Sequence, residues 1–508
     1  MIGITKTICS YGYHTLTVQV EVDILPGLSG LQIVGLGDSA IKESRERIHS
    51  AIVHSGFEFP VKYIVVNLAP NEKPKEGAMS ELAICVAILI ASGQLPQEYF
   101  VDKVLLGSLS LNGELQNTSG LMGATLHASQ LSQISSVIIP HGGLSDVDCI
   151  PDLVLYPLRF MSQLRQIVSG AISPWKNSFI HIPKVTREID MSEVIGLENA
   201  KKGLAYCVIG RHHSMLIGAP GTGKTLLSKA VGSIQPQMSR NEILETSCIY
   251  SMTKLLNTNL VYHRPFRSPH HTTSGIAMVG GGTKPMPGEV SLAHNGILFL
   301  DELMEFPAAT LQALREPMED RIITVSRAKG SFRFPANFQL LAATNPCRCG
   351  YLFSSKQVCS CGPLLVQNLY RKIVGPFLDR ISVELEIPEP PGYNLPDERN
   401  EKNSQWWLEK INEAHKRMLR RNGNISNSQL QLENVKKIYG TLKNYENILR
   451  NYSAANMLSN RGIVNTLRLG VSIMDFHESA VMRDCFLEEA FRYRVICHLK
   501  AKLLDRVA

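Results

Sequence analysis

The chain has 508 residues, of which 44% are hydrophobic and 19% charged, and its formal net charge is +7 at pH 7. This length exceeds what one hydrophobic core usually fills, so we expect about two to four domains, and the composition excludes a largely disordered chain. The mildly basic balance permits an anionic partner such as nucleic acid, and it suits an ordinary solvated surface equally well.

Targeting and cysteine patterns predict a cytoplasmic protein. Residues 1–10 lack the basic start and apolar core of a signal peptide. The longest apolar run, 82–91, is shorter than the about 20 residues that cross a bilayer, so we expect a buried helix there and no membrane partner. Four of the 11 cysteines cluster, and the others stand singly, as reduced cytosolic residues do.

The first part of the chain mixes strand and helix patterns. Strict alternation of apolar side chains over 15–24 predicts a half-buried strand, and Asp38 or Ser39 can cap the helix that follows. Further strands are expected at 63–68, 103–110 and 136–140. These patterns predict an α+β domain over 1–172 and an irregular linker over 173–190.

Two segments of this domain resemble the active segments of the Lon protease domain. They are 73–77, which precedes the apolar helix, and 107–122. That family needs a serine nucleophile and a lysine that takes its proton. Here Met79, or Ala78 if the gap shifts by one, stands at the serine position, and Met122 stands at the lysine position. The resemblance therefore implies a Lon-protease-like fold without peptide hydrolysis, kept for binding, for example of DNA, or for stabilising a ring.

A glycine-rich loop over 218–225 follows the short apolar run 214–217 and precedes the helical pattern 226–231. The loop reads G-x-x-x-x-G-K-T, and the order strand, loop, helix predicts an ATP phosphate site. Backbone N–H groups would surround the β- and γ-phosphates, Lys224 would neutralise charge, and Thr225 would offer its hydroxyl to Mg²⁺. The expected nucleotide-binding residues are Gly218, Ala219, Pro220, Gly221, Thr222, Gly223, Lys224, Thr225 and Leu226.

Polar residues end two later apolar runs. Asp301 and Glu302 follow the run 295–300, and Asn345 ends the run 338–345. Parallel strands deliver catalytic groups at their carboxyl ends, so we expect Asp301 to hold Mg²⁺ through water and Glu302 to orient the attacking water. Asn345 would approach the γ-phosphate.

These three features, in this order, resemble an AAA+ ATPase, whose P-loop α/β domain would span 191–390. Asn345 matches the sensor 1 residue of that family. The resemblance also implies an arginine finger at Arg380 and a sensor 2 arginine at Arg461. A finger supplied by a neighbouring subunit makes hydrolysis depend on assembly, and the family implies a homo-hexameric ring.

Two inserts resemble those shared by magnesium-chelatase ATPase subunits and MCM helicases. The helix 2 insert is expected over 263–287, and two β-prone runs over 322–334 resemble the pre-sensor 1 hairpin. In that geometry the hairpin points into the ring channel, towards a threaded polyanion. The alternative is an exposed basic hairpin without a ligand. The expected DNA-binding residues are Arg264, Arg267, Arg327, Lys329 and Arg333.

Four cysteines form a C-x-C-x9-C-x-C pattern directly after Asn345. They are Cys347, Cys349, Cys359 and Cys361. Four thiolates suffice for a closed tetrahedral Zn²⁺ site with no open catalytic position. Disulfides are the alternative, which a cytosolic protein disfavours. We expect zinc to brace the loop between Asn345 and Arg380.

The last part of the chain consists of long helical patterns. They span 404–421, 428–449, 462–475 and 478–495. We therefore expect an all-helical C-terminal lid domain over 391–508.

Taken together, these features resemble the YifB/ComM family of magnesium-chelatase-like AAA+ ATPases. The fold class implied is multidomain α/β, with the Lon-like, AAA+ and lid domains in that order. The family implies an ATP-driven DNA translocase or helicase that promotes branch migration during recombination in natural transformation. Its cofactors would be ATP, Mg²⁺ and Zn²⁺, and its partners single-stranded and branched DNA and recombination proteins. The alternative is a chelatase-type remodeller of a partner protein.

Overall fold

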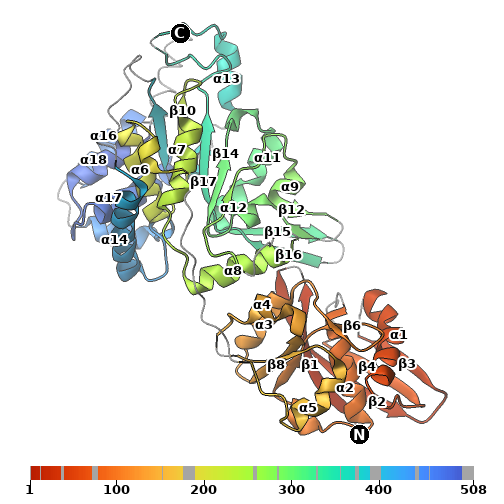
Figure 1. The fold of residues 1–508 in the computed structure, drawn as a ribbon. Helices are drawn as coiled ribbons and strands as arrows, with labels where there is room; N and C mark the ends of the chain where they lie inside the picture. Colours follow the sequence, from red (N-terminus) through yellow and green to blue (C-terminus); the bar gives the residue numbers. More distant parts are fainter. Residues whose placement is uncertain are drawn as a thin grey trace.

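The protein is described by a computed structural model that covers most of the chain. The described residues are 2–11, 13–35, 39–70, 78–151, 153–175, 189–253, 255, 260–282, 285–327, 330–354, 356–371, 377–389, 402–440, 445–456 and 458–494. They form a front domain up to residue 175, a central domain over 189–389 and a helical domain over 402–494 (Figure 1).

The front domain is built on a mixed seven-stranded sheet with the order β3-β4-β2-β1-β5-β8-β9. The strands are β1 (Gly3–Tyr11), β2 (His14–Leu25), β3 (Gly30–Val34), β4 (Tyr63–Ala69), β5 (Lys103–Leu105), β8 (Ser136–Pro140) and β9 (Val154–Leu158). β2 pairs antiparallel with β1 and β4, and the other neighbours run parallel. Val18, Val20 and Val22 of β2 are fully buried, so the alternation predicted there is present.

Helices cover this sheet. They are α1 (Ser39–His54), α2 (Glu81–Ala91), α3 (Leu121–Ser129), α4 (Leu144–Val147) and α5 (Leu164–Val168). Every residue of α2 from Glu81 to Ile90 is buried, as expected from its apolar run. Of the two caps considered for α1, Asp38 lies outside the described residues.

One expected strand is broken in two. The sequence predicted a continuous strand over 103–110, but β5 ends at Leu105 and the chain leaves the main sheet. β6 (Ser108–Leu109) instead pairs with β7 (Leu115–Gln116) in a separate two-stranded sheet. Gly107 lies between β5 and β6 with φ +141°, a backbone conformation that glycine adopts far more readily than other residues.

The central domain contains a parallel five-stranded sheet with the order β11-β14-β17-β10-β18. The strands are β10 (Ser214–Gly218), β11 (Phe266–Arg267), β14 (Ile297–Leu300), β17 (Gln339–Thr344) and β18 (Val383–Ile387). The helices are α6 (Glu198–Gly210), α7 (Lys224–Ala230), α8 (Arg240–Ser251), α9 (Gly275–Val279), α10 (Glu289–Leu292), α11 (Ala308–Ala313), α12 (Arg315–Asp320) and α13 (Pro363–Arg371).

Both faces of the central sheet are covered. Leu216 of β10 packs in an apolar cluster with α6, α7 and the helical domain. Its neighbours Met215 and Ile217 pack in a second cluster with α9, α11 and α12. Burial on both faces is typical of parallel sheets. Since all five strands point the same way, the residues that follow β10, β14 and β17 lie at one edge of the sheet.

Two hairpins extend from the central domain. β15 (Ile322–Arg327) pairs antiparallel with β16 (Gly330–Pro335), as the β-prone runs predicted. β12 (Gly280–Gly281) pairs with β13 (Met286–Pro287) between α9 and α10. The expected helix 2 insert is thus shorter than its sequence suggested, because Phe266 and Arg267 form β11 in the main sheet.

The helical domain contains α14 (Ser404–Asn422), α15 (Leu432–Tyr439), α16 (Tyr445–Asn456), α17 (Asn460–Phe476) and α18 (Asp484–Arg492). Two predicted helices are wrong in extent. The pattern over 428–449 is divided between α15 and α16, and Gly440, a poor helix former, follows the end of α15. The last helix begins at Asp484 rather than 478, because Glu478 adopts a left-handed backbone conformation with φ +58°.

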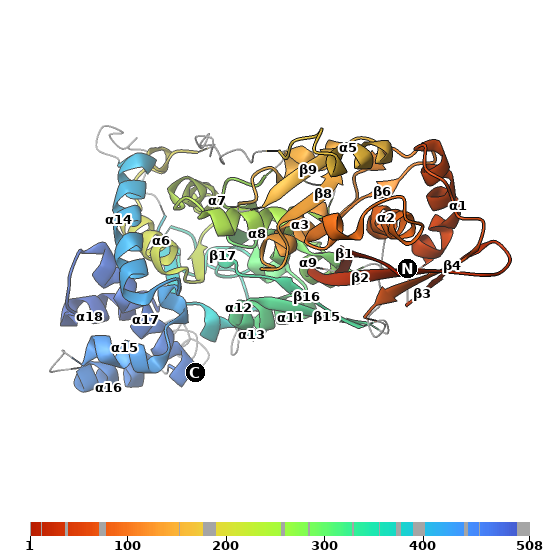
Figure 2. The ribbon, with the colours of Figure 1, turned by 90° about the horizontal axis from the view of Figure 1, so that it is seen from below.

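The front domain docks on helix α8 of the central domain (Figures 1 and 2). Ile243 and Leu244 of α8 share an apolar cluster with Leu121 and Ala124 of α3. Arg240 also donates a hydrogen bond to the Cys149 carbonyl at 3.0 Å. Among the described helices, none is both long and apolar enough to span a bilayer.

Candidate active site

The loop 218–225 follows β10 at the carboxyl edge of the central sheet. The Lys224 Nζ donates to the carbonyls of Gly218 and Ala219 at 2.8 and 2.7 Å, and to Asn345 Oδ1 at 3.1 Å. Lys224 is 8% exposed, and this burial lowers the pKa of its ammonium, an effect that the charge of Asp301 opposes. A phosphate bound in the loop would take over some of these contacts. Lys224 and Asn345, the expected sensor 1 residue, are thus within hydrogen-bond distance of each other.

The residues expected to hold Mg²⁺ are in direct contact. The Thr225 hydroxyl donates to Asp301 Oδ2 at 2.8 Å, and the other carboxylate oxygen accepts the Glu302 N–H at 3.0 Å. Hydroxyl and carboxylate oxygens are the ligands that Mg²⁺ prefers. The donor set therefore fits the ion, which would be completed by water and nucleotide phosphates.

Glu302 contacts a histidine that the sequence analysis did not select. His271 Nδ1 lies 3.4 Å from Glu302 Oε2, and the rings of His271 and His270 have centroids 4.0 Å apart. Glu302 has φ +52°, an uncommon conformation for a residue with a side chain, and such residues cluster at functional sites. The signal for His271 was its place just after β11, a parallel strand of the same sheet.

The two candidate arginines lie elsewhere. Arg380 and Arg461 both bind Glu319, one to each carboxylate oxygen, at 2.6 and 2.5 Å. In the paired strands Ser214 is level with Val383 and Gly218 with Ile387, so Arg380 precedes the amino end of β18. The strand rises about 3.3 Å per residue from Ser214 to Gly218, so the Arg380 backbone is more than about 13 Å from the carboxyl edge of the sheet. The pair cannot reach a phosphate in the loop of its own chain.

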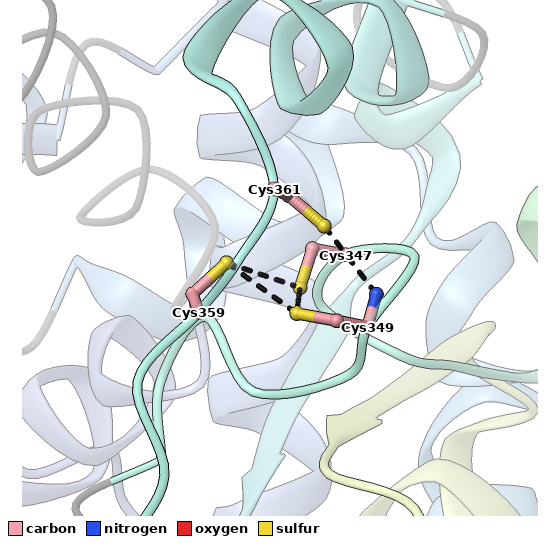
Figure 3. A group of neighbouring side chains, drawn as sticks. All are labelled: Cys347, Cys349, Cys359 and Cys361. Atoms are coloured by element: carbon pink, nitrogen blue, oxygen red, sulfur yellow. Dashed lines mark hydrogen bonds between the residues drawn. The ribbon is translucent and has the colours of Figure 1, made fainter.

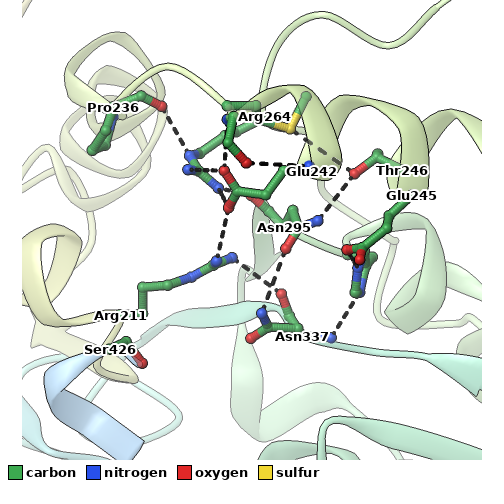
Figure 4. A network of polar contacts seen from close by, with 12 residues as sticks. Arg211, Pro236, Glu242, Glu245, Thr246, Arg264, Asn295, Asn337 and Ser426 are labelled. Atoms are coloured by element: carbon green, nitrogen blue, oxygen red, sulfur yellow. Dashed lines mark hydrogen bonds and ion pairs between the residues drawn. The ribbon is translucent and has the colours of Figure 1, made fainter. Parts of the chain in front are cut away.

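Two of the expected DNA contacts are engaged inside the chain. Arg264 donates to Glu242 at 2.8 Å and to the Asn295 carbonyl at 2.7 Å, and its side chain is 6% exposed (Figure 4). Arg267 forms a two-bond ion pair with Glu289 at 2.7 and 2.8 Å. These contacts speak against a DNA-binding role at both positions, because binding would have to break paired and partly buried charges.

The β15–β16 hairpin has a buried face and an exposed face. Ile323, Val325, Phe332 and Phe334 belong to the apolar cluster beneath it. The opposite face exposes Thr324, Ser326, Ser331 and Arg333. Of the three basic residues predicted to meet DNA here, Arg333 is thus exposed. Lys329 lies outside the described residues, and only the backbone of Arg327 is described.

The four clustered cysteines converge (Figure 3). The sulfur of Cys347 lies 3.3 Å from that of Cys349 and 3.7 Å from that of Cys359, and all four sulfurs lie within 4.8 Å of one another. Sulfurs that share a tetrahedral Zn²⁺ at about 2.3 Å are about 3.8 Å apart. The residues therefore fit a structural zinc ion.

The cysteine loop also packs on the phosphate loop. A Cβ at Gly350 would lie 2.4 Å from Pro220 Cδ, and Gly350 has φ +85°. The position of the cysteines predicts that they brace the segment between Asn345 and Arg380. The structure adds a direct contact with loop 218–225, which only a glycine permits.

Comparisons with known proteins bear on the same three domains. Residues 190–395 match the family model "Magnesium chelatase, subunit ChlI", 20–143 match "Subunit ChlI of Mg-chelatase", and 401–494 match its C-terminal model. YifB of Salmonella typhimurium, an uncharacterized protein, is 36% identical over the whole of both chains. The competence protein ComM of Haemophilus influenzae is 34% identical over 99% of both. The chain belongs to the YifB/ComM family.

The model that matches 20–143 covers most of the front domain. A Lon protease of Orientia tsutsugamushi is 27% identical over 30% of this chain and 20% of its own length. The first Lon-like segment, 73–77, lies outside the described residues; in the second, the Gly107 N–H donates to the Met79 carbonyl at 3.0 Å. Met79 and Met122, which the resemblance to Lon places at the serine and lysine positions, are 3% and 1% exposed and share the apolar cluster that includes α8.

Proposed function

We propose that the chain assembles into a homo-hexameric ring in the cytoplasm that hydrolyses ATP and translocates on DNA. Its role would be branch migration during recombination in natural transformation, with recombination proteins as partners. The observation that carries this proposal is the separation of the Arg380 and Arg461 pair from the phosphate loop of the same chain. Arginines at the opposite edge of the sheet can complete only the site of another subunit, and such head-to-tail contacts form a ring when the rotation between subunits closes.

In this proposal, hydrolysis uses groups from two subunits. Lys224 and the loop N–H groups hold the phosphates, and Asn345 lies within reach of the same phosphates through its contact with Lys224. Glu302 orients the attacking water. Mg²⁺ held by Thr225 and Asp301 would neutralise charge on the β- and γ-phosphates. Arg380 and Arg461 of the neighbouring subunit would stabilise the charge that develops on the transferred phosphoryl group.

The exposed face of the β15–β16 hairpin is the proposed DNA surface. Arg333 supplies positive charge there, and hydroxyl side chains at Thr324, Ser326 and Ser331 can donate to phosphate oxygens. The similarity to a competence protein supports DNA as the polymer. The second candidate, remodelling of a partner protein, is supported by the magnesium chelatase models that the chain matches.

We further propose that Cys347, Cys349, Cys359 and Cys361 hold a structural Zn²⁺. The ion would fix the loop that carries Gly350 against Pro220. Metal analysis of protein purified without chelators should find one zinc per chain, and thiol titration should show all four cysteines protected until the metal is removed. Metal-free protein with four reactive thiols would contradict this part of the proposal.

ATPase and unwinding assays test the proposed function. We expect single-stranded DNA to raise the ATPase rate and the wild type to unwind a branched DNA substrate. The Lys224→Ala variant should show no ATPase activity with DNA and no unwinding, and this result would exclude a contaminating activity. An ATPase that ignores DNA and leaves the branched substrate intact would remove the translocase and favour the remodeller.

A further inference from the structure

Glu319 joins two arginines that come from different domains. Its Oε2 accepts from Arg380 at 2.6 Å, and its Oε1 accepts from Arg461 at 2.5 Å. Arg380 ends a short 3-10 helix of the central domain, Leu378–Arg380, whereas Arg461 lies in the first turn of α17 in the helical domain. One carboxylate thus sets the distance between two guanidinium groups.

Helix α12, which carries Glu319, packs against the rest of the central domain. Its residues Pro317 and Met318, just before Glu319, are buried. The Met318 carbonyl lies 3.3 Å from His213 Nε2, and His213 Nδ1 accepts the Leu340 N–H at 2.9 Å. Burial lowers the pKa of His213 to about 4, so the ring is neutral at pH 7 and its Nε2–H donates. The end of α12 is therefore fixed to the central sheet.

The surroundings of the arginines are also joined across the domain boundary. Asn465 of α17 donates to the Asp379 carbonyl at 2.9 Å, next to Arg380. Glu319 and Arg461 are 43% and 44% exposed at their side chains, and Arg380 is 14% exposed. Two positive charges and one negative charge leave this surface group with a net positive charge. Such a group attracts the phosphates of a ligand presented from outside.

We propose that Glu319 is a positioning residue for ATP hydrolysis: it holds Arg380 and Arg461 side by side, so that both meet the nucleotide of the neighbouring subunit. The inference rests on the proposed function, in which these arginines act across a subunit boundary. Without the carboxylate the two guanidinium groups repel each other, and the chain loses the contact that aligns them. Preorganised donors contribute to catalysis only when they are in place before the charge develops.

The first test measures hydrolysis by Glu319→Gln, which keeps the shape of the side chain and removes its charge. We expect kcat to fall at least tenfold while the KM for ATP changes less than twofold, because the binding loop is intact. In an Arg380→Ala/Arg461→Ala background, where neither arginine is left to position, the same substitution should cause no further loss. Glu316→Gln, at an exposed position of the same helix, is the matched control and should keep the wild-type rate. Equal melting temperatures for the variants exclude a folding defect.

A second test separates this inference from the proposed function. Lys224→Ala subunits carry intact arginines and a dead loop, so mixing them with Arg380→Ala subunits should restore activity if sites form between subunits. Mixing them with Glu319→Gln subunits should restore activity in the same way. No recovery in the Arg380→Ala mixture would overturn the proposed function. Recovery there, combined with wild-type kcat for Glu319→Gln or with a further loss when Glu319→Gln is added to the Arg380→Ala/Arg461→Ala variant, would overturn the role of Glu319 alone.

Discussion

His271 contacts Glu302, the carboxylate proposed to orient the attacking water, at the carboxyl edge of the central sheet. The two side chains lie 3.4 Å apart, and Glu302 is 58% exposed. A neighbour that can donate a proton restricts the orientations of an exposed carboxylate. His271 therefore bears on how Glu302 presents its oxygens to water.

Substitution at His271 tests that role. We expect His271→Ala to lower kcat about tenfold with little change in KM, which is milder than the 10²–10⁴-fold loss typical when a proton acceptor itself is removed. His271→Gln keeps a donor and should retain more activity than the alanine variant. Steady-state ATPase kinetics supply the measurement, and equal kcat in all three proteins would show that Glu302 needs no partner.

Glu242 is the charge that organises the opposite edge of the sheet (Figure 4). Burial alone would raise its pKa, but Arg264 and Arg211 more than offset that effect and lower the pKa of Glu242 from 4.5 to about 2. A carboxylate with a depressed pKa stabilises the fold above its unfolded pKa of 4.5, and this contribution is lost as the pH falls towards 2. It amounts to roughly 3 kcal/mol.

The corresponding experiment compares melting temperatures across pH. Glu242→Gln should melt well below the wild type at pH 7, and the gap should narrow between pH 4.5 and pH 2. Glu446→Gln, at a position 78% exposed on α16, should follow the wild-type curve. Parallel curves for wild type and Glu242→Gln would mean that the ion pairs contribute no net stability.

At the scale of the element, the loop with the four cysteines and the phosphate loop form one unit. Ala at Gly350 would place a methyl group 2.4 Å from Pro220 Cδ in a backbone conformation that disfavours side chains. Overpacking of this kind costs about 1–3 kcal/mol. We expect Gly350→Ala to weaken ATP binding about tenfold, measured by nucleotide titration. Gly362→Ala, where a Cβ meets nothing within 4 Å, should bind as the wild type does. Equal affinities for the two variants would contradict the bracing contact.

The β15–β16 hairpin makes a separate prediction about DNA. Arg333→Glu should weaken binding to single-stranded DNA, and the dependence of log K on log[salt] should flatten by about 0.7 per lost phosphate contact. Arg450→Glu, on the exposed face of α16, carries the same charge change and should leave binding unaltered. An unchanged affinity and slope for Arg333→Glu would place the DNA path elsewhere.

Local patterns predicted the elements whose signals are complete within a few residues. The alternation in β2, the apolar run of α2 and the glycine loop after β10 specify their own conformations. The break at Gly107 was missed, because a single residue outweighed an otherwise continuous pattern. Pairings between distant residues were also out of reach: the sequence marked Arg264 as basic but could not show Glu242 beside it, nor that Arg380 and Arg461 share Glu319.

In the whole molecule, the front domain contacts the central domain at helix α8. This helix carries Glu242. Of the two arginines that bind Glu242, Arg211 lies before β10 and bonds the Asn337 carbonyl before β17, and Arg264 bonds the Asn295 carbonyl before β14. On that edge Arg321 also bonds Asn337 and Ser428, which connects the helical domain. The edge of the sheet opposite the phosphate loop thus joins all three domains. Arg380 and Arg461, which we propose contact the nucleotide of a neighbouring subunit, lie at this same edge.

The central claim is that each ATP site is completed by a second subunit. Its most direct test is the ATPase rate per subunit across a dilution series, with the molecular mass followed by light scattering and single-stranded DNA present throughout. The rate per subunit should fall in step with the loss of assemblies and approach zero in monomers. A rate per subunit that stays constant when only monomers remain would contradict it.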